Sequence, residues 1–161
     1  MRNKKNTINR FTKIKEDPVY NSILISRITN QLMQDGRKTI AAKIIYHALD
    51  IIKEGTKTDP LEYLLASLEN VKPEIEIRSR RVGGANYQVP VPVPAGRKES
   101  LAIRWIIKAA GDRPNKTYHT FGEKLAAELM EAHESQGGAM KKKQDVHKMA
   151  EANKAFAHFR W

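Results

Sequence analysis

Several features that would assign this chain to a common functional class are missing. Cysteine is absent from its 161 residues, which excludes disulfide bonds, thiol catalysis and cysteine-ligated zinc. No run approaches the roughly 18 consecutive apolar residues of a membrane-spanning helix. The first 16 residues alternate charged with single apolar residues, a pattern unlike that of a secretory signal.

Patterns typical of an enzyme are also scarce. The five histidines, at positions 47, 119, 133, 147 and 158, form no HExxH motif and no pair at helical spacing, which favours surface positions over metal ligation. Gly83-Gly84 lacks the GK[ST] of a phosphate loop. A solvent-exposed helix face explains four glutamates better than paired catalytic acids would: Glu123, Glu128, Glu131 and Glu134. We therefore expect no catalytic activity, no cofactor and no metal.

Positive charge is what the sequence has in excess. It holds 29 Lys and Arg against 18 Asp and Glu, a formal net charge of +11, and 40% of its residues are hydrophobic. This length and hydrophobic content suffice for one domain with a core. The charge indicates a polyanionic partner, most commonly nucleic acid, while membrane surfaces and acidic proteins stay open at this point.

The positive charge is concentrated in three zones. Residues 1–16 carry +5, residues 72–116 carry +6 and residues 140–161 carry +4. Between them, residues 17–71 carry −1 and residues 117–139 carry −3. Charge that served only solubility would be spread more evenly, so the clustering favours specific binding faces.

Residues 17–73 predict three helices. Asp17-Pro18 matches an N-cap followed by proline, and apolar residues then recur at helical spacing until Asp35-Gly36. A second helix is expected from Thr39 to Gly55. Asp59-Pro60 starts a third that Pro73 ends, with Glu62 placed as in a capping box. Its buried stripe is expected to be Leu61, Leu64, Leu65 and Leu68.

The periodicity changes to two after Pro73. Residues 74–81 and 87–93 both alternate, and Gly83-Gly84 between them predicts a β-hairpin. Three prolines at positions 90, 92 and 94 share one parity, so their missing N–H groups lie on one side of the strand. Val89, Val91 and Val93 can still pair with the first strand. Because no third strand could add there, we predict a two-stranded arm that packs its base on helices.

Three further helices are expected after the hairpin. Ser100 would cap one that ends near Gly111, with Trp105 on its apolar stripe. An amphipathic helix would follow and close at Gly137-Gly138, and a basic helix would cover about 140–157. The sequence thus predicts a mainly α fold: a single domain of six helices over 17–161, with a protruding β-hairpin arm at about 73–93 and a basic flexible tail at 1–16.

Arginine gathers at the tip of the predicted arm. Arg78 and Arg80 share one strand face, and Arg81 adds a third guanidinium. The planar guanidinium binds phosphate bidentately and stacks on bases. Charge can also keep an edge strand soluble, and Glu74 and Glu76 at the strand base fit that explanation. The basic cluster at the tip does not, which favours nucleic-acid contact.

These residues alone leave the type of nucleic acid open. By itself, Lys141-Lys142-Lys143 would more often be a solvated run of charge. The two other basic zones are what favour nucleic-acid contact here. An architectural DNA-bending protein also carries basic β-arms on a helical body, but this Gly-Gly turn offers no hydrophobic wedge. An RNA-processing enzyme is a third class, for which the sequence offers no convincing catalytic residue.

Six motifs spread over most of the chain are distinctive. The most specific are Arg80 to Val91 (RRVGGANYQVPV), Ala102 to Trp105 (AIRW) and Lys141 to Trp161 (KKKQDVHKMAEANKAFAHFRW). The other three are Asp17 to Ser22, Leu32 to Lys38 and Glu69 to Pro73. In this order they closely resemble the motifs of the small-subunit ribosomal protein seven family, bacterial type. Two departures, Glu99 after Arg97-Lys98 and Ala110 to Pro114 where the family is basic, weaken the expected RNA contacts around 99–112.

The resemblance implies a six-helix body with a protruding hairpin that binds small-subunit ribosomal RNA directly. Such proteins nucleate assembly of the 3′ major domain, the head, near the exit-site tRNA, the messenger path and neighbouring ribosomal proteins. Many bacterial members also repress translation of their own operon messenger. The implied location is the cytoplasmic ribosome of a bacterium or the ribosome of an organelle, with no membrane and no small-molecule substrate as partner.

Motif matches and basic zones together give the expected RNA-binding residues. They are Arg2, Lys4, Lys5, Arg10, Arg37, Lys38, Lys72, Arg78, Arg80, Arg81, Arg104, Lys141, Lys142, Lys143 and Lys148.

Overall fold

The computed structural model describes residues 14–159, so the predicted tail contacts of Arg2, Lys4, Lys5 and Arg10 lie outside the described residues. This part of the chain holds six α-helices, one two-stranded sheet and a 3₁₀ helix. In chain order they are α2 (Ile23–Leu32), α3 (Lys38–Thr56), α4 (Pro60–Val71), β1 (Ile75–Val82), β2 (Ala85–Pro92), α5 (Ala95–Asp112), α6 (Phe121–His133), α7 (Gly137–Ala152) and η1 (Lys154–Phe159). The predicted mainly α fold with a two-stranded arm is confirmed.

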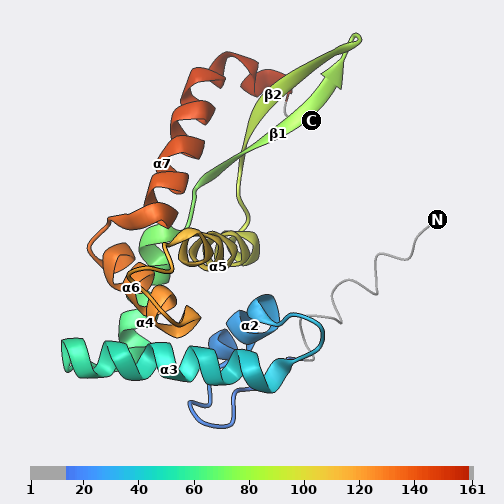
Figure 1. Cartoon of the computed structure of the whole chain (residues 1–161). Coiled ribbons are helices and arrows are strands. Elements are labelled where there is room, and N and C mark those ends of the chain that lie inside the picture. The colour runs from blue at the N-terminus through green and yellow to red at the C-terminus, as the bar shows by residue number, and fades with distance from the viewer. Residues whose placement is uncertain (1–13, 160–161) are drawn as a thin grey trace.

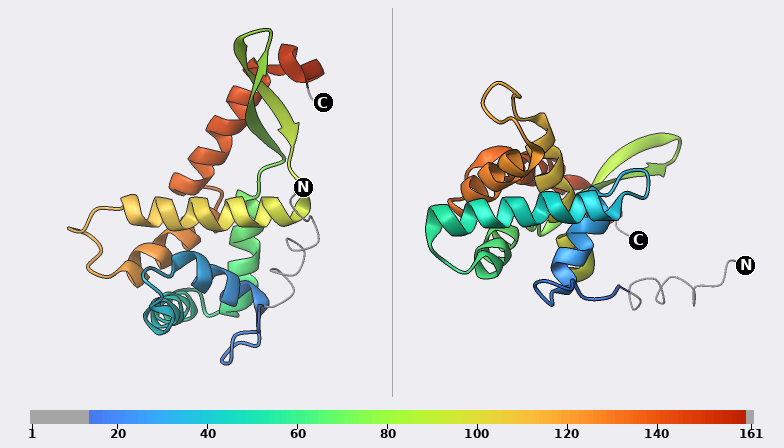
Figure 2. Two further views of the ribbon diagram at one scale, coloured as in Figure 1. Left: turned by 90° about the vertical axis from the view of Figure 1, so that its right-hand side faces the viewer. Right: turned by 60° about the horizontal axis from the view of Figure 1, so that its bottom comes forward.

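The helices form a body from which the arm and α7 project side by side. α6 packs against α3, α4, α5 and α7, which makes it the central helix. β1 packs along α7, and β2 contacts η1. Figure 1 shows α3 at the base of the body and the arm with α7 rising from the opposite side, and the views in Figure 2 agree. No helix within residues 14–159 combines the length and apolar character that crossing a membrane requires.

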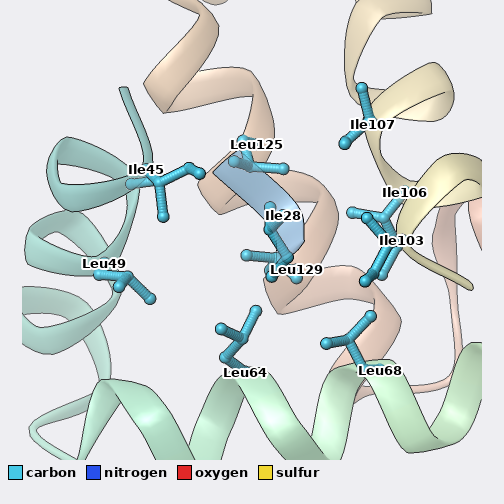
Figure 3. Close-up of a pocket in the computed structure, with 11 residues that line it drawn as sticks. Ile28, Ile45, Leu49, Leu64, Leu68, Ile103, Ile106, Ile107, Leu125 and Leu129 are labelled. Carbon is cyan, nitrogen blue, oxygen red and sulfur yellow. The ribbon is translucent and has the colours of Figure 1, made fainter. Parts of the chain in front are cut away.

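The core lies where α2, α3, α4, α5 and α6 meet. Aliphatic side chains from all five helices point toward one another there (Figure 3). They surround an apolar cavity of about 10 Å³, no larger than one water molecule needs, so it is a packing gap and not a ligand site. Leu64 and Leu68 are buried as predicted, but Leu65 is 55% exposed, so its assignment to the buried stripe was wrong.

Asp17-Pro18 does not begin a helix as predicted, because α2 begins only at Ile23. The Asp17 carboxylate instead accepts hydrogen bonds from the backbone N–H groups of Val19 and Tyr20, at 3.1 Å each. It also accepts one from the Tyr46 hydroxyl at 2.7 Å. Burial and this bond to Asp17 raise the pKa of Tyr46 to about 12. Asn21, at φ 48°, then leaves the helical conformation, so Asp17 caps only the single turn that ends at Asn21.

Two other helix starts differ from the prediction. α5 begins at Ala95, and Ser100 lies inside it with its hydroxyl donating to the Gly96 carbonyl. Arg97 in the first turn of α5 is ion-paired with Glu76 at 2.6 Å, a contact that no local pattern reveals. Gly137-Gly138 begins α7 and does not close α6, which ends at His133. Asp59 caps α4 as predicted, whereas the full capping box occurs at α6, between Thr120 and Glu123.

Glu128 is a further correction, because it was assigned to a solvated face and is only 1% exposed. Arg113, in the loop before α6, donates to Glu128 at 2.6 Å and to Glu131 at 2.5 Å. The other Glu128 oxygen accepts from the Ala139 N–H at 2.8 Å. Since the N-cap Gln136 makes no side-chain cap, Glu128 supplies the cap of α7 from a neighbouring helix.

Candidate nucleic-acid interface

The arm is held in one register by its turn and its prolines. Val82 pairs with Ala85 around Gly83 and Gly84, whose φ angles of 57° and 90° are those of a type I′ turn. Counting from this turn, Pro90 and Pro92 occupy positions that make no ladder hydrogen bonds. The Val93 N–H donates to the Glu74 carbonyl at 2.9 Å. The predicted pairing through the valines is therefore confirmed.

The arm packs on α7 and η1, the two helical elements after α6, and not only on the helices at the base of the arm. Tyr87 of β2 contacts the rings of Phe156 and Phe159 in η1, at centroid distances of 5.2 and 5.1 Å. Val89 beside it is fully buried. We call Tyr87, Phe156 and Phe159 the aromatic cluster. It fixes η1 against the arm and thereby brings two predicted basic zones, the arm and α7, onto one projection (Figure 1).

The three arm arginines differ in how free they are. Arg78 is ion-paired with Glu76, its own strand neighbour, at 2.5 Å. Arg80 and Arg81 are exposed, and neither belongs to an ion pair among residues 14–159. Burial alone would raise the pKa of Glu76, but hydrogen bonds from Arg97 and Arg78 outweigh it and hold that pKa below the ordinary value. The free positive charge of the arm thus lies at its tip.

The lysines of α7 divide in the same way. Lys141, Lys142 and Lys148 are exposed, whereas the Lys143 ammonium donates to the Asn70 carbonyl at the end of α4, at 2.5 Å. Lys72 is ion-paired with Glu69 one turn before it. Lys143 therefore joins α7 to α4, whereas the contact of Lys72 stays within α4. Both are favourable cations at the C-terminus of α4, and both line a groove with Lys98.

Arg104 is exposed on α5 and lies between two grooves. One, between α5 and α7, is also lined by Lys108 and Lys142. The other, between α2 and α5, is also lined by Arg27 and Arg97. Arg27, Arg97 and Lys108 were not among the predicted site residues. Arg27 was missed because residues 17–71 are nearly neutral overall, and Arg97 was discounted because Glu99 follows Arg97-Lys98.

Arg37 and Lys38 lie apart from the other predicted residues. Both are exposed where the loop after α2 enters α3. The loop turns through Asp35 and Gly36, which both have positive φ. It lies at the far side of the body from the tip of the arm (Figures 1 and 2). The described basic residues therefore form an extended surface over the arm, α7 and α5, with Arg37 and Lys38 as a separate patch.

Comparison with known proteins gives one consistent result. The family model for ribosomal protein S7p/S5e matches residues 2–154. The chain is 55% identical over 149 residues to small ribosomal subunit protein uS7 of Caldicellulosiruptor bescii, covering 92% of this chain and 94% of that protein. It is 56% identical over 145 residues to the protein of the same name from Carboxydothermus hydrogenoformans, covering 90% and 91%.

Proposed function

Because the chain belongs to the ribosomal protein S7p/S5e family, we propose that it is a structural constituent of the small ribosomal subunit that binds the subunit's RNA directly. Its role is structural and non-catalytic, as in its family. The proposal includes nucleation of the 3′ major (head) domain and a position near the exit-site tRNA, the messenger path and neighbouring ribosomal proteins. The ribosome in question is that of a bacterial cytoplasm or of an organelle.

One structural observation supports RNA binding above the others. Arg80, Arg81, Lys141, Lys142 and Arg104 come from three separate elements, and all five are exposed. The elements contact each other, because β1 packs on α7 and α7 packs on α5. Spaced cations on a rigid frame suit the phosphates of a folded RNA, which is recognised largely by shape and backbone contacts.

The decisive experiment measures affinity for a small-subunit RNA head-domain fragment over a range of salt concentrations. Arg80→Ala/Arg81→Ala is compared with Lys43→Ala/Lys53→Ala, which removes two exposed charges from α3, at the base of the body. We expect the arm variant to bind more weakly and to lose roughly 1.5 to 2 units of the slope of log K against log salt. The α3 variant should bind as the wild type does.

Two outcomes would contradict the proposal. Wild-type affinity that barely changes with salt would exclude phosphate contacts as the main source of binding energy. Stronger binding to duplex DNA than to folded ribosomal RNA in direct competition would favour the architectural DNA-binding alternative. Sedimentation of the protein with the small subunit through moderate salt is the complementary test.

The same surface is proposed to bind the protein's own operon messenger, as many members of the family do. Competition between a messenger fragment and the ribosomal RNA fragment tests this. Mutual displacement, weakened alike by Arg80→Ala/Arg81→Ala, is the expected result. A messenger that binds without displacing the ribosomal RNA would contradict a shared surface.

A further inference from the structure

The arm begins at Glu74, whose backbone is hydrogen-bonded on both sides. Pro73, after α4, is fully buried and has no N–H, so Glu74 carries the first N–H of the arm. This N–H donates to Nε2 of His147 on α7 at 3.3 Å. The Glu74 carbonyl accepts from the N–H of Val93, the residue after β2, at 2.9 Å. We call the bond between Glu74 and His147 the latch, because it joins the start of the arm to α7.

The latch exists only while the His147 ring is neutral. A ring nitrogen accepts a hydrogen bond through its lone pair, whereas the protonated ring has two N–H donors and no acceptor. Histidine is the side chain that changes charge between about pH 5 and 8, so mild acid breaks this bond. Within residues 14–159 the other polar contact between the arm and the helices is the ion pair of Glu76 with Arg97. It survives to lower pH, because the pKa of Glu76 is held below its ordinary value.

Charges of both signs lie around the His147 ring. Cations oppose a positive charge on the ring and carboxylates favour it, so their effects counter each other. Neither kind of group replaces the acceptor that the Glu74 N–H loses when the ring is protonated, because protonation leaves the backbone N–H in place beside a donor. The charged groups around the ring are Glu69 and Lys72 at the end of α4, Glu74 at the base of the arm, Lys98 on α5, Lys143 on α7 itself and Glu151 one turn further along α7.

We propose that the latch is a pH-sensitive switch that fixes the base of the arm on α7 at neutral pH and releases it in mild acid. Release acts at the base alone, because the aromatic cluster still packs β2 on η1. The arm then keeps its contact with η1 and loses its fixed attachment at Glu74. The switch belongs to the free protein, so it stands or fails independently of RNA binding.

Solvent exchange of the Glu74 amide, measured by NMR on the full chain, reports the latch directly. Its protection is the exchange rate of an unstructured peptide divided by the observed rate at the same pH. Between about pH 8 and pH 5 the His147 ring C–H resonances follow protonation in the same samples. Below the midpoint of that titration, the protection of the Glu74 amide should fall about tenfold for each pH unit, because one proton breaks one bond.

Two substitutions separate the latch from other effects of pH. His147→Gln supplies a carbonyl oxygen that accepts without titrating, so the Glu74 amide should stay protected over the whole range. His147→Ala has no acceptor, so the amide should exchange freely at every pH. His119→Gln, an exposed histidine in the loop before α6, is the matched control and should respond to pH as the wild type does.

Three results would overturn the proposal. Protection of the wild-type Glu74 amide that does not follow the ring titration would show that protonation leaves the bond intact. A loss that persists in His147→Gln would assign the effect to another group, and this variant decides the matter even if His147→Ala does not fold. A parallel loss of protection in α6 would mean global unfolding in place of a local release.

Discussion

Replacing Arg113 by methionine should destabilise the protein strongly, although Arg113 lies in a loop. The substitution keeps much of the side-chain volume but leaves the Glu128 carboxylate buried with only the Ala139 N–H as a partner. Burial alone would lower the pKa of Arg113, yet its hydrogen bonds to Glu131 and Glu128 outweigh burial and raise it. This shows how tightly the pair is coupled.

The size of the effect follows from the burial of the two partners. Breaking a buried ion pair by removing one partner costs about 3–5 kcal/mol. Arg113 retains 12% side-chain exposure and Glu128 retains 1%, and the Ala139 N–H still stabilises the carboxylate. We therefore expect the low end, about 3 kcal/mol, which lowers Tm by roughly 6–12 °C in a domain of this size.

Urea unfolding at neutral pH measures this loss. Adding Glu128→Gln should recover at least half of the loss, since the amide oxygen still accepts from Ala139. Glu131→Gln is the control and should cost less than about 1 kcal/mol, because Glu131 is 42% exposed.

Two results would refute this reasoning. A loss below about 1 kcal/mol for Arg113→Met would mean that the pair behaves as a surface contact. A double variant as unstable as Arg113→Met alone would show that the stranded charge is not the cause.

Three further predictions concern other elements. The pKa of Glu76 is lower in the folded protein than the ordinary glutamate value of 4.5, so its ion pairs stabilise the fold fully above pH 4.5. This stabilisation is lost as the pH falls through the pKa of Glu76 in the folded protein. Glu76→Gln should therefore flatten the acid side of the curve of unfolding free energy against pH. Gly84→Ala should destabilise the arm by about 1–2 kcal/mol, because the Gly84 φ angle of 90° is costly for alanine. Amide hydrogen exchange should become faster in the hairpin and stay unchanged in α6. Thr120→Ala should cost about 1 kcal/mol in urea unfolding through loss of the α6 cap, and Thr120→Ser should not.

Local patterns predicted the elements whose information lies within a few residues. The Gly-Gly turn and the parity of the prolines are enough to fix the register of the arm, and Asp59-Pro60 is enough to start α4. The start of α5 was missed because its first turn is held by Arg97 and Glu76, which are distant in sequence. Glu128 was misplaced for the same reason, since its spacing matches a solvated face and its partner Arg113 lies in a loop.

The candidate interface was predictable where basic residues cluster and not where they stand alone. Charge counting found the arm tip and α7. It could not tell that Lys72 and Lys143 are engaged within the protein, because their partners are a carboxylate and a backbone carbonyl of α4. The α2 side of the groove between α2 and α5 escaped notice because Arg27 stands in a nearly neutral stretch and meets α5 only in the folded chain.

The aromatic cluster has a consequence for the order in which the protein matures. The hairpin is synthesised well before η1, so Tyr87 has no ring of η1 to pack against at first. An isolated two-stranded hairpin is marginal in water, so the arm should sample several orientations until Phe156 and Phe159 arrive. The helical body needs α6, its central helix, and a fixed arm must in addition await the segment beyond α7. The proposed RNA-binding surface is therefore completed last, when η1 docks on the arm.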